Sequence, residues 1–321
     1  MNLVEHRAPP VYVDELVINW HITEACNYSC TYCYAKWDSA HRTRDVFHDM
    51  QAVRALLSDL RQFFDPDNPD NPLRASMRWR ALRLSIAGGE PMLYADKMLQ
   101  MMQIARDLGF SVSLITNGSL LPVDMGLLAS TLSVLGVSID SADFATSALI
   151  GRRDRKGSTV SLNDIVQRIA TARAANPRLQ VKINTVVNAH NQHEDMHVML
   201  AQLQPDRWKV LRVLPLVDAS LAISAADFSA FVARHTAYDA IMAPEDNEVM
   251  TETYIMIDPL GRFFQNAPLQ NLRPYRYSAP IGEVGVANAF SAIRFSAAGF
   301  AGRYVPIVTA DARMMVNHMP S

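Results

Sequence analysis

The stretch LVINWHITEACNYSCTYC (16–33) joins a short β-rich run to three closely spaced cysteines. The apolar run at 16–22 predicts a β-strand, and Cys26, Cys30 and Cys33 follow it directly in the pattern CxxxCxxC. Three thiolates on one short loop can hold three irons of a cubane iron–sulfur cluster and leave the fourth iron without a protein ligand. An open iron can bind a cofactor. We therefore predict that these three cysteines hold a [4Fe–4S] cluster.

The chain has no other cysteine, which limits the alternatives. An odd, clustered set is not a disulfide framework. A zinc site made from the three cysteines and His21 remains open, because zinc closes a tetrahedron with sulfur and nitrogen ligands. Structural zinc sites favour CxxC pairs, so the spacing favours the cluster. A second metal site made only of cysteines cannot be built.

Similar β-rich runs recur along the chain and alternate with stretches of helical periodicity. The runs lie at 16–22, 82–88, 111–117, 132–140, 179–187 and 208–216. The helical stretches lie at 46–64, 94–108, 122–131, 161–175, 193–203 and 225–236. Apolar strands separated by helices imply a parallel sheet covered by helices. The sequence predicts an α/β fold, a partial (β/α)6 barrel rather than a closed barrel of eight units.

The alternation of strands and helices breaks down after residue 237. We expect three parts: an N-terminal segment (1–15), the partial barrel (16–237) and a C-terminal extension (238–321) that completes the site. Within the extension, TYIMID (253–258) and RFFQN (262–266) predict a β-hairpin.

Composition excludes several classes of protein. The 321 residues carry 30 lysines and arginines against 32 aspartates and glutamates, so the net charge is −2. That balance argues against a surface devoted to nucleic acid. The longest apolar runs fall well short of the roughly 18 residues that a membrane span needs, and the N-terminus lacks the layout of a signal peptide. We expect a cytoplasmic protein that binds neither nucleic acid nor a membrane.

Polar and special residues gather just after the predicted strands. They are Gly88-Gly89-Glu90-Pro91, Thr116-Asn117-Gly118-Ser119 and Ser138-Ile139-Asp140-Ser141. In β/α barrels the site is built at the carboxyl ends of the strands, so we expect these groups to surround it. Each motif taken singly also fits a turn or a helix N-cap.

The CxxxCxxC and GGEP motifs together resemble those of radical S-adenosylmethionine (radical SAM) enzymes. The resemblance is closest to the viperin family, in particular its shorter prokaryotic members. The matching stretches run in colinear order from about residue 16 to residue 266. They are HITEACNYSCTYC, LSIAGGEP, ITNGSLL, SIDS, LIGR, VKINTVVN, DRWKVL, PEDN, YIMID and RFFQN. The resemblance implies a radical SAM partial barrel with a [4Fe–4S] cluster and S-adenosylmethionine as cofactors.

The family resemblance also implies an activity. The enzyme would convert a ribonucleoside triphosphate to its 3′-deoxy-3′,4′-didehydro form, an antiviral chain terminator. In the mechanism assigned to the family, the reduced cluster cleaves S-adenosylmethionine, and the resulting 5′-deoxyadenosyl radical takes hydrogen from C4′ of the ribose. The 3′-hydroxyl then leaves as water, and one electron plus one proton complete the product. An electron donor such as a flavodoxin or a ferredoxin is implied as well.

Residues can be assigned to the cofactor by the same resemblance. The GGEP loop would contact the methionine amine, and short polar side chains at the next strand ends suit hydrogen bonds to the ribose or other polar groups. The residues expected to contact S-adenosylmethionine are Gly88, Gly89, Glu90, Asn117, Ser119, Ser138 and Asp140.

Cations near the strand ends suit a triphosphate, although solvated surface charges are the alternative. Lys182 matches the family's phosphate-binding lysine, and Asn184 lies on the same side of the strand. The residues expected to bind substrate are Lys36, Arg152, Lys182, Asn184, Lys209 and Asn247.

Tyr254 is the candidate catalytic residue, because the matching tyrosine of the family is proposed to donate the last hydrogen. Aromatic packing in the hairpin is the alternative. His21, His190 and His193 have no evident partner in the sequence, and we expect them to be ordinary polar residues.

Two other functions remain open. One is a radical SAM enzyme acting on a peptide or another small molecule, although many of those carry auxiliary clusters for which this chain has no cysteines. The other is a zinc-stabilised nucleotide-binding module.

Unlike animal viperins, the chain is expected to lack a membrane-binding helix, and it ends MVNHMPS without their C-terminal tryptophan. We expect a monomer, and the sequence does not distinguish CTP, UTP, GTP and ATP.

Overall fold

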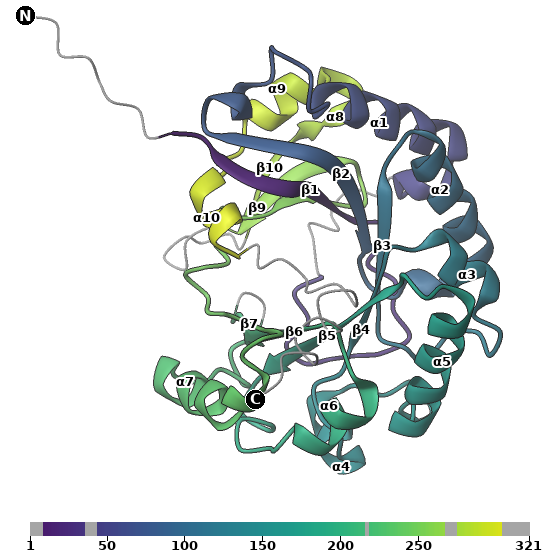
Figure 1. Cartoon of the computed structure of the whole chain (residues 1–321), viewed down its shortest axis with the longest axis vertical. Coiled ribbons are helices and arrows are strands. Elements are labelled where there is room, and N and C mark those ends of the chain that lie inside the picture. The colour runs from purple at the N-terminus through teal and green to yellow at the C-terminus, as the bar shows by residue number, and fades with distance from the viewer. Residues whose placement is uncertain (1–8, 36–43, 216–217, 267–274, 304–321) are drawn as a thin grey trace, which may run out of the picture.

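The computed structural model of the chain describes residues 9–35, 44–215, 218–266 and 275–303. Within these ranges the strands form a ten-stranded sheet in the order β10-β9-β8-β1-β2-β3-β4-β5-β6-β7. The sheet curves into an incomplete ring (Figure 1). Its edges, β7 and β10, do not pair with each other. The predicted α/β partial barrel is confirmed.

Strands β1 to β7 pair in parallel and in sequence order. They are β1 (Val11–His21), β2 (Met77–Ala87), β3 (Ser111–Thr116), β4 (Val134–Ser138), β5 (Gln180–Val187), β6 (Arg207–Arg212) and β7 (Met242–Glu245). All six predicted strands are present. We did not predict β7, because its sequence MAPE is short and contains proline, which sheets tolerate mainly at an edge.

Helices cover the outer side of the curved sheet (Figure 1). The predicted ones are α1 (Met50–Phe63), α2 (Ala95–Asp107), α3 (Gly126–Thr131), α5 (Leu162–Ala175), α6 (His197–Leu203) and α7 (Ala225–Arg234). Several start at a capping residue: the side chains of Asp49, Ser161 and Ser224 accept hydrogen bonds from N–H groups of the first turn. Helix α4 (Phe144–Ile150) was not predicted, and it ends at Gly151 in the left-handed conformation. Short 3₁₀ helices are η1 (Val46–His48), η2 (Pro72–Ala75), η3 (Pro91–Tyr94) and η4 (Thr236–Tyr238).

The sheet has an apolar outer face and a polar inner face. Along β1, Leu16, Ile18 and Trp20 are fully buried in the hydrophobic core, whereas Asn19 and His21 line an internal cavity. Side chains alternate across a strand, so one strand supplies both the core and the site. Each large apolar side chain contributes roughly 1.5–3 kcal/mol when it is fully buried.

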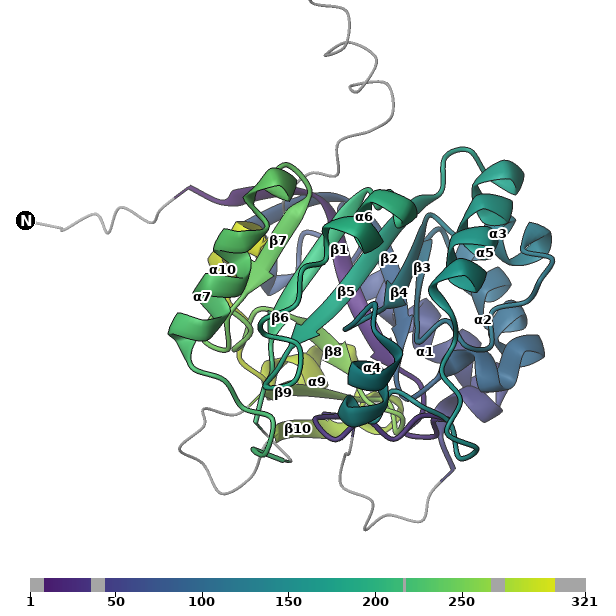
Figure 2. The same ribbon diagram turned by 90° about the horizontal axis from the view of Figure 1, so that it is seen from below.

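The predicted C-terminal hairpin is confirmed. Strands β8 (Ile255–Ile257) and β9 (Arg262–Asn266) pair antiparallel, and β8 joins β1 in parallel. They are followed by β10 (Tyr275–Pro280), α8 (Ile281–Val284), α9 (Val286–Ser291) and α10 (Ala297–Arg303). Figure 2 shows these strands and α4 at the same end of the barrel. Residues after 237 thus continue the barrel sheet, and the three-part division stays a prediction.

None of the helices in the described ranges combines the length and the apolarity that crossing a membrane requires.

Candidate functional site

The three cysteines lie on the loop that follows β1, at the carboxyl end of the sheet. None of the three forms a disulfide, and all are half-buried. Burial raises the pKa of Cys30 to about 12, with Arg152 opposing the shift and Cys33 and Cys26 adding to it.

The spacing of the sulfur atoms separates a cluster from a single zinc ion. Two sulfur ligands of one tetrahedral zinc lie about 3.8 Å apart, because each Zn–S bond is about 2.3 Å long. In the described part of the chain, the only three His, Cys, Asp or Glu side chains with ligand atoms all within 4.8 Å are Asp195, His197 and His235. At least one pair of the cysteine sulfurs therefore lies more than 4.8 Å apart, further than two ligands of one zinc ion. Three thiolates suit a cubane with one open iron.

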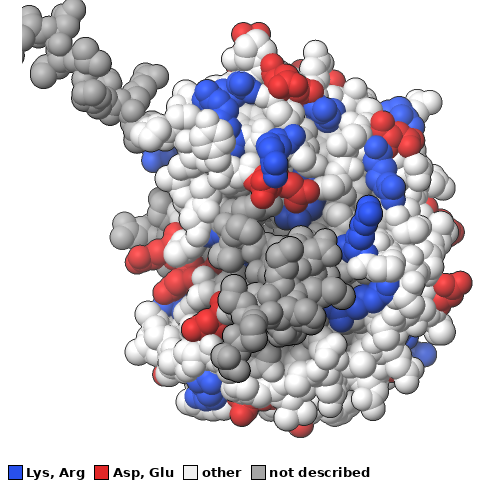
Figure 3. Space-filling view, in the orientation of Figure 1, with Lys and Arg blue, Asp and Glu red and all other residues white. Residues whose placement is uncertain are grey.

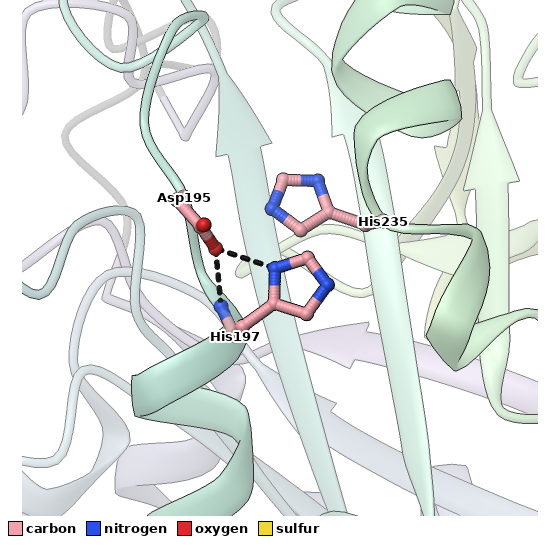
Figure 4. A group of neighbouring side chains, drawn as sticks. All are labelled: Asp195, His197 and His235. Carbon is pink, nitrogen blue, oxygen red and sulfur yellow. Dashed lines mark hydrogen bonds and ion pairs between the residues drawn. The ribbon is translucent and has the colours of Figure 1, made fainter.

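Asp195, His197 and His235 lie close together (Figure 4), but their hydrogen bonds argue against a metal site. The Met196 backbone N–H donates to Nε2 of His235 at 3.0 Å, and Nδ1 of His235 donates to the Phe231 carbonyl at 2.8 Å. Both ring nitrogens are engaged, so no lone pair of His235 is left for a metal. The ring of His197 stacks on that of His235 with centroids 5.1 Å apart. The group therefore fastens α6 to the end of α7.

The GGEP motif (88–91) lies directly against the loop that leads to the cysteines. The N–H groups of Gly89 and Glu90 donate to the carbonyl oxygens of Thr23 and Ala25, at 2.7 and 2.8 Å. A Cβ atom on Gly89 would lie 2.1 Å from the Ala25 carbonyl oxygen, so only glycine fits there. The two motifs are one structural unit.

The carboxylate of Glu90 is fully buried and holds the motif to the end of β3. It accepts hydrogen bonds from the Thr116 hydroxyl, the Asn117 N–H and the Met92 N–H, at 2.7, 2.7 and 2.9 Å. Burial raises the pKa of Glu90, and these hydrogen bonds oppose the shift. The carboxylate is thus engaged by the protein itself, and the predicted contact of Glu90 with the cofactor stays a prediction.

Asn117 and Ser119 bind the cysteine loop. Asn27 donates to the Ser119 hydroxyl and accepts from the Asn117 amide, both at 2.9 Å. The Asn117 amide nitrogen also lies 3.9 Å from Sγ of Cys26. Both predicted cofactor residues therefore lie against the loop that carries the cysteines.

Ser138 and Asp140 lie at the end of β4, where they meet Arg152. The Arg152 guanidinium donates to the Ser138 carbonyl and pairs with the buried Asp140 carboxylate at 3.3 Å. Tyr32 of the cysteine loop donates to the same carboxylate. We predicted Arg152 among the phosphate ligands, but it lines a cavity beside the cysteine loop that the predicted lysines of β5 and β6 do not line.

Two adjoining cavities lie inside the curved sheet. The mouth cavity, of about 210 Å³, is lined by His21, Tyr32 and Asn184 among others. The inner cavity, of about 90 Å³, reaches further toward the amino ends of the strands, to Val17 and Arg83. Residues common to both linings are Asn19, Ser85, Lys182, Lys209 and Tyr254.

The inner cavity is rich in positive charge. Its charged lining residues are Arg83, Lys182, Arg207, Lys209, Arg303 and Glu245. Burial lowers the pKa of Lys182 well below its usual value, and the charges of Lys209 and Arg83 lower it further. An excess of buried cations is an electrostatic site for a polyanion. The three arginines escaped prediction because single arginines in a sequence read as surface charges.

Strand register explains how the lysines reach the inside. Lys182 and Asn184 share one face of β5, and they pair with Arg207 and Lys209 of β6. On the other side, Lys182 pairs with Gly136 of β4. A Cβ atom on Gly136 would lie 3.3 Å from Cε of Lys182 and 2.4 Å from the Ile115 side chain. The glycine therefore leaves room for the lysine.

The other predicted substrate residues differ in position. Tyr254 lines both cavities, and its hydroxyl accepts a hydrogen bond from Lys209. Asn247 is buried and donates to the Val213 carbonyl at 3.3 Å, and it lines neither cavity. Lys36 lies outside the described residues.

His21 lines the mouth cavity, although we expected an ordinary polar residue. Burial lowers the pKa of His21 to about 3, so the ring is neutral at pH 7. It packs edge-on against Tyr34 and Phe264, with centroids 5.7 and 5.4 Å apart. Its alternation with Asn19 in an apolar strand is the sequence signal that indicates an inward position.

Charges of both signs mix on the molecular face that Figure 3 shows. A net charge of −2 therefore coexists with a strongly basic interior cavity. The expected lack of nucleic-acid binding stays a prediction.

Comparison with known proteins gives several matches. Residues 20–203 match the radical SAM superfamily. The chain is 40% identical to an S-adenosylmethionine-dependent nucleotide dehydratase of Pseudoalteromonas ulvae, over 92% of this chain and 94% of that protein. It is 36% identical to a protein of the same name from Fibrobacter sp., over 94% of this chain and 91% of that protein.

Solved structures match in fold. Native anSMEcpe with bound AdoMet and the Kp18Cys peptide has a TM-score of 0.63 at 12% identity, covering 87% of this chain and 81% of that one. Streptococcus suis SuiB bound to the precursor peptide SuiA has a TM-score of 0.54 at 14% identity, covering 93% and 67%. At such low identity these matches establish the fold alone.

Proposed function

Because the chain belongs to the family of S-adenosylmethionine-dependent nucleotide dehydratases within the radical SAM superfamily, we propose that it removes water from a ribonucleoside triphosphate. The product is the 3′-deoxy-3′,4′-didehydro nucleotide, an antiviral chain terminator. One observation carries the proposal: a cation-rich inner cavity adjoins a mouth cavity that reaches the cysteine loop. The first suits phosphates and the second suits a ribose.

The enzyme's cofactors are a [4Fe–4S] cluster and S-adenosylmethionine, which together supply a 5′-deoxyadenosyl radical able to take hydrogen from C4′. We assign the cluster to Cys26, Cys30 and Cys33. The backbone of the GGEP loop faces the methionine amine, and Arg152 with Ser138 suits its carboxylate. This assignment moves Arg152 from the substrate to the cofactor.

The triphosphate binds in the inner cavity. Lys182 and Lys209 stand at the boundary of the two cavities, so they reach phosphates whose ribose lies in the mouth cavity. Arg83 from the middle of β2 and Arg207 from the amino end of β6 surround the phosphates. Asn184, which lines the mouth cavity only, is left to contact the ribose.

Tyr254 donates the last hydrogen in this proposal. Burial raises the pKa of Tyr254 well above its usual value, and the nearby Glu245 charge adds to the shift. The phenol therefore keeps its hydrogen at pH 7. Its position in the wall of both cavities lets it reach the ribose end of a bound triphosphate.

The proposal includes the surroundings in which the enzyme works. A small one-electron carrier, a flavodoxin or a ferredoxin, reduces the cluster. The protein acts as a monomer in the cytoplasm.

The experiment is to incubate the reconstituted, reduced protein with S-adenosylmethionine and each ribonucleoside triphosphate separately. We expect one triphosphate to stimulate formation of 5′-deoxyadenosine and to yield a product lighter by one water, detected by mass spectrometry. The matched control is the Cys30→Ala variant. Equal background cleavage with all four triphosphates would contradict the proposal and return attention to other small molecules or peptides.

A further inference from the structure

Glu245 is a buried carboxylate that the proposed chemistry does not use. It ends β7 in the wall of the inner cavity and is 2% exposed. Burial alone would raise its pKa, but Lys209 and Arg303 hold the pKa of Glu245 at about 2. The group is therefore ionised at pH 7, and a negative charge in this cavity repels phosphates. A role other than substrate binding accounts better for its position.

The carboxylate fixes the hydroxyl of Tyr254. Oε2 of Glu245 accepts the hydrogen bond that the Tyr254 hydroxyl donates. Oε1 lies 3.1 Å from Nζ of Lys209, which itself donates to the Tyr254 oxygen. A phenol whose donor and acceptor are both engaged is held in one orientation.

Arg303 holds the ring of the same tyrosine. Its guanidinium carbon lies 3.4 Å from the Tyr254 ring centroid, and its Nε lies 3.2 Å from Oε1 of Glu245. A cation against an aromatic face is attracted to it. Helix α10 is tied down there, because Arg207 donates to the Arg303 carbonyl at 2.8 Å and Arg303 donates to the Thr253 hydroxyl at 3.0 Å.

We propose that Glu245 and Arg303 are positioning residues that clamp Tyr254 at the boundary of the two cavities. The inference rests on the proposed function and concerns only its last step. After C4′ has lost hydrogen and the 3′-hydroxyl has left as hydroxide, Tyr254 gives one electron to the ribose radical cation and one proton to the hydroxide. The O–H bond breaks, and water and the C3′=C4′ product form. The one-electron carrier then reduces the remaining tyrosyl radical, which takes up one proton from water to restore the phenol.

The test is the Glu245→Gln variant with two readouts. The amide keeps the shape of the side chain and removes its charge. The Tyr254 hydroxyl then loses the charged acceptor that holds it in one orientation. Lys209 and Arg303 no longer pair with a carboxylate, so they can interact with phosphates. We expect the ratio of nucleotide product to 5′-deoxyadenosine to fall on the order of tenfold. We expect triphosphate affinity, measured by calorimetry, to rise severalfold because a repulsive charge is removed. A merely structural role would lower affinity, thermal stability and both products together.

Matched variants sharpen the result. Glu248→Gln changes an exposed carboxylate three residues on and should leave both readouts at the wild-type value. Arg303→Gln should lower the product ratio as well, because the ring loses its stacking partner. If Glu245 acts only through Tyr254, adding Glu245→Gln to Tyr254→Phe should change the ratio no further.

The outcomes separate this inference from the proposed function. Wild-type protein that forms no nucleotide product defeats the proposed function itself. Active wild type with an unchanged product ratio in Glu245→Gln defeats only the clamp. If Glu245→Gln does not fold, the ratio of nucleotide product to 5′-deoxyadenosine in Arg303→Gln decides. A wild-type ratio in that variant also contradicts the proposed positioning of Tyr254.

Discussion

The cofactor end and the inner cavity of this barrel are built in different ways. At the cofactor end, two contiguous motifs pack backbone against backbone, as Gly89 does on Ala25. In the inner cavity, single side chains from separate strands converge, as Lys182, Arg207 and Glu245 do. A motif of adjacent residues can be found in a sequence, whereas a convergence of single residues is made by the fold. Substitutions at the two ends should therefore fail in different ways.

Loss of a cluster ligand should have the largest effect. Cys30→Ala is expected to abolish cleavage of S-adenosylmethionine, because two thiolates cannot hold the cubane in place of three. Iron content and 5′-deoxyadenosine yield after anaerobic reconstitution measure it. Ser29→Ala, a change at the exposed neighbouring residue, is the control. Retained cleavage in folded Cys30→Ala protein would remove the basis for the cluster assignment.

A larger side chain between the GGEP loop and the cysteine loop should reduce activity nearly as much as loss of a cysteine. Gly89→Ala places a Cβ atom 2.1 Å from a backbone oxygen, so the GGEP loop has to move away from the cysteine loop. We expect cofactor binding to fall by at least about a hundredfold, because the loop backbone no longer faces the cofactor. Gly282→Ala, where no atom lies within 4 Å of the new Cβ, is the matched control. Equilibrium binding of S-adenosylmethionine to both reconstituted variants makes the comparison, and normal affinity in Gly89→Ala would contradict it.

Tyr254→Phe should separate the two ends kinetically. The variant keeps the ring and its contact with Arg303, so radical generation at the cofactor end should continue while product formation fails. Side-by-side yields of 5′-deoxyadenosine and nucleotide product measure this, with Tyr238→Phe, a tyrosine that lines neither cavity, as control. Full product yield would return Tyr254 to a packing role.

The same contrast explains how far the sequence could be read. Alternating strands and helices predicted the sheet, and CxxxCxxC with GGEP located the cofactor end, because both are local patterns. Strand β7 and helix α4 are too short to show a period. Arg83 and Arg303 became site residues only because β2 and α10 meet at the inner cavity, and no local pattern encodes that meeting. Arg152 was predicted as a phosphate ligand, and only the fold places it beside Asp140 rather than in the inner cavity with Lys182.

Removing one phosphate ligand should have a moderate effect. A charge-assisted hydrogen bond contributes roughly 1.5–3 kcal/mol, so Lys182→Ala is expected to weaken triphosphate binding about tenfold to a hundredfold. The loss should shrink for the diphosphate and the monophosphate of the same nucleoside. Arg152→Ala should instead weaken S-adenosylmethionine binding, with little dependence on phosphate number. Arg178→Ala, exposed at the amino end of β5, is the control. Calorimetric titrations measure these affinities. Equal affinity of the wild-type protein for the monophosphate, the diphosphate and the triphosphate would contradict the triphosphate site.

A change of pH should alter triphosphate affinity through the same lysines without any substitution. Burial lowers the pKa of Lys209 to about 8, with Glu245 opposing the shift, and the pKa of Lys182 is lowered as well. A bound triphosphate favours the charged ammonium groups and so raises both pKa values in the complex. Below pH 8, Lys209 is already charged and its contribution to affinity is constant. Above pH 8, binding takes up a proton, and affinity falls by up to about tenfold per pH unit for each proton taken up.

Titrations at pH 8.5 in two buffers of different ionisation enthalpy measure this uptake directly. Lys209→Arg should remove the part of the proton uptake that comes from Lys209, because a guanidinium stays charged. Affinity that stays constant from pH 8 to pH 9.5 in wild-type protein would place the phosphates away from these lysines.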